Sequence, residues 1–162
     1  MKKNALLIIM IMLFASSAFS QLNVYAEGAI STKENVKARL GIGAMYLHPI
    51  TDAFHLGANM AYRQSLTSDY YAAQIPIMAV ARYYVMGDAT GFYPQVSLGL
   101  VNSFSRIKVF NNTIKSSSSN FGFNVGAGYR LDNNLDFSLL YENIVFENAS
   151  ASAFLIRVGF NF

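Results

Sequence analysis

The chain has 162 residues, of which 53% are hydrophobic and 13% are charged, enough for one domain. It contains no cysteine, which argues against disulfide bonds and against anchoring through an acylated cysteine. The formal net charge is +3, but two of the twelve basic residues are Lys2 and Lys3. Without these two the chain is nearly neutral, so its charge gives no indication of nucleic-acid binding.

Residues 1–20 have the pattern of a secretory signal peptide. Two lysines precede an uninterrupted apolar run from Ala5 to Phe14, and small residues follow as far as Ser20. Because ten apolar residues form too short a helix to cross a bilayer of about 30 Å, a cleaved signal is favoured over a membrane anchor. We expect cleavage after Ser20 and a mature domain formed by residues 21–162.

From residue 21 onward the hydrophobic pattern has a period of two, which is typical of β-strands with two different faces. There is no run of eighteen apolar residues and no sustained helical spacing, so no transmembrane helix is predicted. Turn-forming residues separate the alternating segments. We expect eight strands, near residues 22–31, 37–47, 54–64, 73–86, 92–104, 120–131, 135–146 and 152–162.

One face of these segments is apolar, while the other is polar or small. In chain order the polar face carries Glu27, Arg39, His55, Arg63, Gln74, Arg82, Gln95, Asn124, Arg130, Asp136, Glu142 and Arg157, with glycines between them. The exceptions fall in the fourth, fifth and seventh segments. There Pro94 and Asn143 lie on the apolar face, and Met78, Val80, Leu140 and Ile144 lie on the polar face.

A soluble barrel of the lipocalin type would also alternate, with its apolar face inward. Two features favour a membrane barrel instead. Glycines inside strands suit a narrow polar lumen, and aromatic residues recur eight positions apart on the apolar face. Eight residues span about 21 Å along a tilted barrel axis, close to the height of the apolar band of such barrels. We expect aromatic girdles that contain Phe54, Tyr62, Phe121, Tyr129 and Phe154.

These patterns predict an eight-stranded antiparallel up-and-down transmembrane β-barrel, since backbone groups in hydrocarbon must all be hydrogen-bonded and a closed sheet has no edges. With both mature termini in the periplasm, short turns fall near 48–53, 87–91 and 131–134. Surface loops then fall near 32–36, 65–72, 105–119 and 147–151. The longest, 105–119, has no strand pattern and is the candidate contact surface.

The lumen of an eight-stranded barrel is just wide enough for its own side chains. If the last turn is centred near residue 149, Glu142 lies almost opposite Arg157, and closure of the barrel brings Glu27 to the same arginine. The turn at 131–134 brings Arg130 near Asp136, and we place Arg39 in the same set of lumen ion pairs. Five inward arginines against three inward acids leave open a polar conduit or a small-anion site, but the narrow diameter favours a structural role.

Small barrel enzymes that modify lipids are the main alternative class. They need a nucleophile or a general base, usually with a histidine close to the lipid. The chain contains only His48 and His55, and both fall near the predicted periplasmic end, away from the serines of 105–119. We therefore predict no catalytic residue, no cofactor and no metal site.

The segments "ARLGIGAMYL", "QIPIMAVARYYV" and "FGFNVGAGYRL" and the aromatic terminus resemble the small outer membrane β-barrel proteins, the porin-like or OmpA/OmpX-type group. Members are variously structural, adhesive or host-interacting, and the resemblance implies contact with outer membrane lipids and lipopolysaccharide. Val158, Phe160 and Phe162 resemble the signal that the barrel assembly machinery recognises in this group.

The interpretation that follows is a non-enzymatic integral outer membrane protein of a Gram-negative bacterium, with a structural role or surface recognition of an unidentified ligand through its loops. A lipid A or phospholipid-modifying enzyme and a narrow small-solute channel remain as alternatives.

Overall fold

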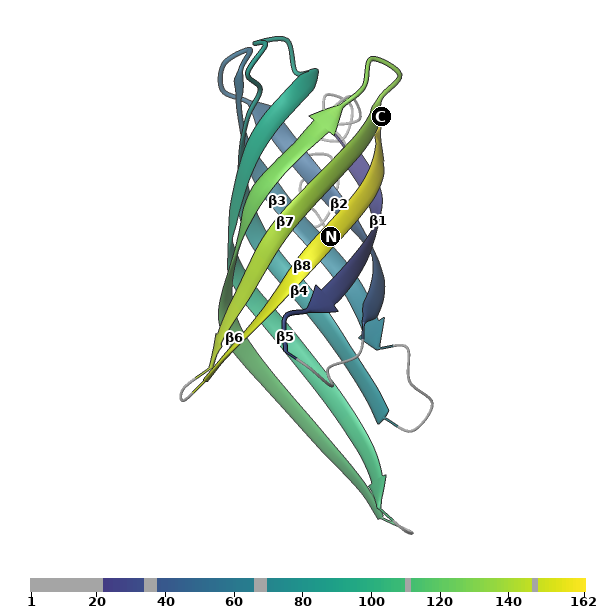
Figure 1. Cartoon of the computed structure of the whole chain (residues 1–162). Helices are drawn as coiled ribbons and strands as arrows, with labels where there is room; N and C mark the ends of the chain where they lie inside the picture. The colour runs from purple at the N-terminus through teal and green to yellow at the C-terminus, as the bar shows by residue number, and fades with distance from the viewer. Residues whose placement is uncertain (1–21, 34–37, 66–69, 110–111, 147–148) are drawn as a thin grey trace, which may run out of the picture.

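The computed structural model describes residues 22–33, 38–65, 70–109, 112–146 and 149–162, so the expected signal peptide lies outside the described residues. These residues form a closed barrel of eight antiparallel strands in which each strand pairs with the next and the last pairs with the first, as predicted (Figure 1). The strands are β1 (Leu22–Ser31), β2 (Arg39–Pro49), β3 (Phe54–Ser65), β4 (Tyr70–Tyr83), β5 (Gly91–Val109), β6 (Asn112–Arg130), β7 (Leu135–Phe146) and β8 (Ala149–Asn161).

The alternation of side chains along each strand separates an inner from an outer face. On β8, Ile156 and Val158 point outward and are 50% and 45% exposed, whereas Arg157 between them is 4% exposed. Within the barrel the outward set is mainly apolar, and the inward set carries the buried charges. This is the reverse of a soluble barrel, in which the apolar side chains fill the interior. Among the described residues, no helix is long and apolar enough to cross a membrane.

The residues that depart from the alternating pattern still take the faces that the period predicts. Met78 and Ile144 are buried in the lumen, where they pack with Val101. Pro94 and Asn143 lie on the outer face, and the Asn143 amide donates a hydrogen bond to the Ser152 hydroxyl at 2.8 Å. The lumen therefore contains apolar layers between its charged clusters, which explains why the sequence pattern is irregular in β4, β5 and β7.

Two inward glycines allow neighbouring strands to approach closely. A Cβ atom on Gly57 would lie 1.8 Å from the carbonyl oxygen of Tyr46, and one on Gly126 would lie 2.2 Å from the carbonyl oxygen of Leu139. Any larger residue would force backbone atoms apart at these positions. The glycines are thus required by the small cross-section of the barrel rather than by turn geometry.

Both ends of the described chain lie at the end of the barrel that carries the short turns. The amide of Phe162 donates to the carbonyl oxygen of Leu22 at 2.9 Å. The connections 50–53, 84–90 and 131–134 lie at this end, and the last is closed by a hydrogen bond from the Leu131 amide to the Leu135 carbonyl at 2.8 Å. We call it the turn end, and the opposite end the loop end.

The prediction of a loop without strand pattern at 105–119 is wrong. β5 continues to Val109, β6 starts at Asn112, and the two strands stay paired to these residues. In Figure 1 this hairpin extends well beyond the other strands at the loop end. The serines at 116–119 carry little intrinsic preference for strand, but backbone pairing with β5 continues the ladder that begins inside the barrel. Backbone pairing with β5 therefore decides the structure of these serines, and their weak intrinsic preference for strand does not.

Candidate functional site: the lumen clusters and the surface hairpin

Four charged side chains from four strands meet in the lumen. Nε of Arg63 lies 2.6 Å from Oε1 of Glu27, and its NH1 lies 2.7 Å from Oε1 of Glu142. Nε of Arg157 lies 2.8 Å from the second oxygen of Glu27. All four side chains are almost fully buried. This loop-side cluster (Glu27, Arg63, Glu142, Arg157) joins β1, β3, β7 and β8 across the barrel, so Arg63 ties strands that are not neighbours in the sheet.

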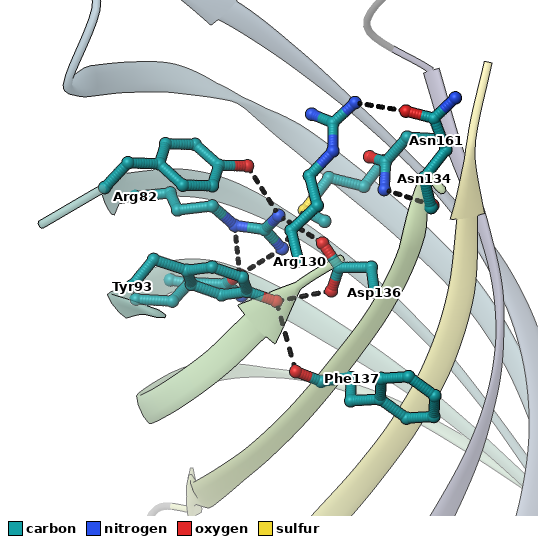
Figure 2. Close-up of polar contacts among 11 residues, drawn as sticks. Arg82, Tyr93, Arg130, Asn134, Asp136, Phe137 and Asn161 are labelled. Atoms are coloured by element: carbon teal, nitrogen blue, oxygen red, sulfur yellow. Dashed lines mark hydrogen bonds and ion pairs between the residues drawn. The ribbon is translucent and has the colours of Figure 1, made fainter. Parts of the chain in front are cut away.

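A second set of side chains surrounds Arg82 nearer the turn end (Figure 2). NH1 of Arg82 lies 2.7 Å from Oδ2 of Asp136, and its Nε and NH2 donate to Oε1 of Gln95 at 3.1 and 2.8 Å. The Tyr93 hydroxyl donates to the other oxygen of Asp136, and its ring lies 3.8 Å from the Arg82 guanidinium carbon. NH1 of Arg82 also donates a hydrogen bond to the Tyr84 hydroxyl at 3.1 Å. We call Arg82, Tyr84, Tyr93, Gln95 and Asp136 the turn-side cluster.

The structure brings together one of the predicted ion pairs as described from the sequence. Glu27 and Arg157 lie opposite each other where β1 closes on β8, and their side chains form the 2.8 Å contact given above. Arg130 and Asp136 are also opposite each other in the ladder. However, Arg82 and Tyr93 occupy the Asp136 carboxylate, and Arg130 instead donates to the side-chain oxygen of Asn134 at 3.2 Å.

The predicted pairing of Glu142 with Arg157 is wrong. Glu142 lies opposite Ala153, and Arg157 lies opposite Ser138. The pairing of Phe146 with Ala149 gives the two strands a register whose centre lies earlier than the position near 149 that we expected. The resulting shift in register is an even number of residues, which keeps every side chain on its predicted face while changing its partner.

Arg39 points into the lumen, but none of the four ion pairs among the described residues includes it. Its Nε has no hydrogen-bond partner there, and neither do NH2 of Arg63 and both terminal nitrogens of Arg157. The guanidinium carbon of Arg157 lies 4.7 Å from the centre of the Tyr25 ring, a favourable cation–π arrangement. The described lumen thus carries more arginine than carboxylate.

The two central residues of the clusters, Arg63 and Arg82, were assigned to the lumen face but not to any ion pair. Their partners lie on strands distant in the sequence: Arg63 on β3 reaches β1 and β7, and Arg82 on β4 reaches β7. Pairing the residues of neighbouring strands from the sequence cannot reveal contacts between strands that face each other across the lumen. The available signal was that both arginines are on the inward face of their strands, where a charge needs a partner.

The predicted girdle residues all lie outside the lumen. Tyr62, Phe121, Tyr129 and Phe154 are 40–50% exposed, and Phe54 is half-buried at the start of β3. The Tyr62 hydroxyl lies 2.7 Å from the Tyr71 hydroxyl of the next strand. Phe160 and Phe162 make an edge-to-face ring contact, with centroids 5.2 Å apart. Val158 is outward on the same strand.

The two histidines lie on different faces near the turn end. His48 is exposed on the outer face, and the His55 ring packs edge-on against Tyr84 with centroids 4.9 Å apart. His55 also lines a cavity of about 520 Å³ at this end, together with Asp52, Asp88 and Arg130. No group of His, Asp or Glu side chains in the described parts of the chain is arranged to hold a metal ion.

The β5–β6 hairpin has one sheet edge that is open. β6 pairs with β5 from Asn112 onward, but its pairing with β7 starts only at Phe121. Residues 112–120 therefore have a ladder partner on one side alone among the described residues. On the other side of the hairpin, β4 pairs with β5 as far as Tyr70 opposite Ile107. Beyond Ile107, only the last two residues of β5 lack a described β4 partner, so the long open edge lies on β6. Ser116–Ser119 on this edge are exposed.

Comparison with known proteins gives one family and several solved structures of the same fold. The family model for the outer membrane protein beta-barrel domain matches residues 5–162. The N-terminal β-barrel domain of Pseudomonas aeruginosa OprF is similar, with a TM-score of 0.71, 16% identity and coverage of 90% of this chain and 99% of that one. No curated protein matches the sequence.

Two further solved structures show the same fold with different roles. Ail, the attachment invasion locus protein of Yersinia pestis, has a TM-score of 0.69 at 11% identity, covering 88% of this chain and 97% of its own. The outer membrane enzyme PagL has a TM-score of 0.56 at 12% identity, covering 86% and 99%. Likeness at this level of identity establishes the fold and not the activity.

Proposed function

Because the chain belongs to the family of outer membrane protein β-barrel domains, we propose that it is a non-enzymatic integral protein of the bacterial outer membrane that displays the β5–β6 hairpin for recognition. The open edge of β6 over residues 112–120 is the observation that supports this proposal. The barrel is the frame, and the hairpin is the contact surface.

In the proposed orientation the turn end and both termini face the periplasm and the loop end faces outward. The short turns at one end and the extended hairpin at the other support it, since barrels of this class have short periplasmic turns and longer outer connections. Outer membrane lipids and lipopolysaccharide would then contact the apolar face. Val158, Phe160 and Phe162 would serve as the sequence read by the barrel assembly machinery.

The lumen contents argue for a rigid frame rather than a channel. Arg63, Arg82, Tyr84 and Tyr93 have no exposed surface or almost none, and they lie across the barrel in the two clusters. A conducting path would require these buried ion pairs to separate, which leaves charges without partners in a site of low dielectric.

The positions of the candidate nucleophiles argue against an enzyme. The exposed serines at 116–119 lie on the hairpin at the loop end, and His55 lies at the turn end against Tyr84. A general base must lie within hydrogen-bond reach of the group it activates. These serines and His55 are at opposite ends of the barrel.

The open edge of β6 fits an extended peptide segment of a partner protein. Unpaired amide and carbonyl groups on a sheet edge can be completed by an added strand, with the backbone supplying affinity. Native edges usually carry proline, bulges or several charges that prevent such pairing. Residues 116–119 carry only serine side chains, which leave the backbone accessible.

The test is a shortened hairpin that keeps the barrel register. Phe104 lies opposite Ser117, so replacing residues 105–116 with Asn-Gly joins the strands through a two-residue turn of a favoured type. We expect this variant to assemble into a heat-modifiable barrel in the outer membrane. A photoreactive residue at Ser118 of the full-length chain, on intact cells, should form protein adducts that one at Leu98 does not.

Two single proline variants separate the edge from the hairpin as a whole. Successive amides along a strand point to opposite sides, so of Ser117→Pro and Ser118→Pro one removes a bond to β5 and the other only an amide of the open edge. With the photoreactive residue moved to Asn120, the variant that removes only an open-edge amide should abolish adducts while the barrel remains assembled. Equal adduct formation by the parent and both variants would refute edge recognition.

A further inference from the structure

Two arginines of the loop-side cluster have hydrogen-bond donors that remain unpaired inside the lumen. Arg63 and Arg157 are only 0% and 4% exposed. NH2 of Arg63 and both terminal nitrogens of Arg157 have no hydrogen-bond partner among the described residues. Because each terminal nitrogen of a guanidinium carries two hydrogens, these three nitrogens leave six N–H groups buried without an acceptor. Buried polar groups in proteins nearly always have a partner.

The donors of Arg63 and Tyr25 lie over two glycines of β2. Gly41 lies between Glu27 on β1 and Arg63 on β3, and a Cβ atom on Gly41 would lie 2.9 Å from Cγ of Arg63. Gly43 is the next inward residue of β2 and is opposite Tyr25. A Cβ atom on Gly43 would lie 2.6 Å from the Tyr25 hydroxyl oxygen. The two side chains therefore cover adjacent inward positions of the same strand.

Arg157 reaches this part of the lumen from the other side of β1. Arg157 and Arg63 bond different oxygens of the Glu27 carboxylate, so the two guanidinium groups flank one side chain. The guanidinium carbon of Arg157 also lies 4.7 Å from the centre of the Tyr25 ring. The Tyr25 hydroxyl has no hydrogen-bond partner in the described parts of the chain, and the residue is 3% exposed. Unpaired donors from β1, β3 and β8 thus lie together beside Glu27.

The described lumen has more unpaired donors than unpaired acceptors. Only two of the buried side-chain atoms without a partner are carbonyl oxygens, namely Oδ1 of Asn59 and Oε1 of Gln74. Two such oxygens cannot satisfy six N–H groups. A buried water needs partners for its own hydrogens as well as for its lone pairs, whereas a halide ion accepts hydrogen bonds and donates none. The surplus of donors therefore fits an anion better than water.

We propose that the lumen binds one small monovalent anion, of the chloride class, between the guanidinium groups of Arg63 and Arg157 and the hydroxyl of Tyr25. The anion accepts hydrogen bonds from the three side chains and offsets part of the excess of arginine over carboxylate. It is a fixed component of the frame, not a solute in transit. The site lies inside the barrel, so it depends neither on the β5–β6 hairpin nor on a partner protein.

The first experiment measures unfolding of the full mature chain from vesicles in urea. Sodium chloride is replaced stepwise by sodium gluconate at constant ionic strength, because gluconate is too large for a lumen filled with side chains. A ligand that binds only the folded state lowers the unfolding equilibrium constant by the factor 1 + [L]/Kd. Above the Kd, a tenfold increase in chloride should therefore lower this constant about tenfold. Equal unfolding midpoints in the two salts would overturn the proposal.

Three variants distinguish this site from a general effect of salt on stability. Arg157→Met removes both unpaired terminal nitrogens and should abolish the chloride dependence, whereas Arg130→Gln removes an inward arginine at the turn end and should retain it. Tyr25→Phe keeps the ring against Arg157 and removes only the hydroxyl, so chloride affinity should fall by about tenfold, the effect of one hydrogen bond to a charged group. Tyr25→Phe carries the test if Arg157→Met does not fold. Unchanged chloride dependence in Arg157→Met or in Tyr25→Phe would show that the anion is not bound here.

Crystals of the mature chain grown in sodium bromide locate the anion directly, because bromide gives an anomalous signal and water does not. We expect an anomalous peak in contact with Arg63, Arg157 and Tyr25. Peaks confined to the protein surface would indicate an adventitious ion only and would overturn the proposal, as would density without anomalous signal at the expected position. A folded barrel without bound anion counts against this inference alone, whereas failure to fold into bilayers counts against the proposed membrane role.

Discussion

Strand β6 lies in two different environments. Between Phe121 and Arg130 it is paired on both sides, and its inward side chains pack over a lumen held by the two charged clusters. Between Asn112 and Asn120 it is paired on one side only and runs beyond the barrel (Figure 1). The same strand is thus part of a rigid frame at one end and part of an exposed hairpin at the other. Stability should depend on the first region and recognition on the second.

The largest effect is expected at Arg63, which holds two buried carboxylates. Arg63→Met leaves Glu142 buried without its ion-pair partner, and removing one partner of a buried pair costs about 3–5 kcal/mol. We expect this loss in the free energy of unfolding from vesicles, measured by urea titration with heat-modifiable migration as a second readout.

Two matched variants refine the prediction for Arg63. Arg157→Met should cost less, because Arg157 bonds only Glu27, and Glu27 retains Arg63. Arg63→Met/Glu142→Gln should recover much of the loss, since the remaining pair of Glu27 with Arg157 is balanced. A single Arg63→Met variant as stable as the parent would show that the lumen clusters do not stabilise the frame.

An intermediate effect is expected at an inward glycine. Gly57→Ala places a Cβ against the carbonyl oxygen of Tyr46, and such overpacking typically costs about 1–3 kcal/mol. Gly28→Ala is the control on the outer face, where space is open, and should change the free energy of unfolding by less than about 0.5 kcal/mol. Equal effects at the two positions would contradict the assignment of a tight lumen and open space at Gly28 on the outer face.

Shortening the hairpin should have little effect on the frame. The variant with Asn-Gly in place of residues 105–116 removes no member of either lumen cluster, so its free energy of unfolding should stay within about 0.5 kcal/mol of the parent. The same urea titration measures it. A loss as large as that of Arg63→Met would mean that the hairpin and the barrel form one cooperative unit.

The smallest effect is expected in the β4–β5 turn. Hydrogen bonds from the side chain and backbone of Thr90 lower the pKa of the exposed Asp88 carboxyl. A lowered pKa in the folded state stabilises it above the unfolded pKa, and the contribution is lost as the pH falls through the folded value. NMR titration of Asp88 should show a midpoint below the ordinary aspartate value, and Thr90→Ala should raise it. An unchanged midpoint in Thr90→Ala would contradict this cause.

The sequence predicts the frame well because the physical constraint on it is periodic. A strand in a membrane barrel must be apolar at every second position, so even Met78 and Asn143, whose residue types do not fit, take the faces that the period assigns. The register is less constrained. The β7–β8 register differs from the expected one by an even number of residues, which preserves the faces and therefore leaves no trace in the pattern.

The sequence predicts the partners of lumen charges less well. Glu27 and Arg157 are neighbours across a strand pair, so their contact follows from closure. The contact of Arg63 with Glu142 crosses the lumen and depends on strand tilt and stagger, which the alternating pattern does not encode. The hairpin at 105–119 was missed for a related reason. Its serines have no hydrophobic alternation, and its strands form because the barrel ladder extends into them.

Residue-resolved hydrogen exchange of the mature chain in nanodiscs tests the division of β6 most directly. We expect slow exchange for amides of residues 121–130. In residues 112–120, alternate amides should exchange fast, namely those that point to the open edge. Uniform slow exchange along the whole strand would show that no open edge exists, and it would contradict the separation of frame from recognition surface.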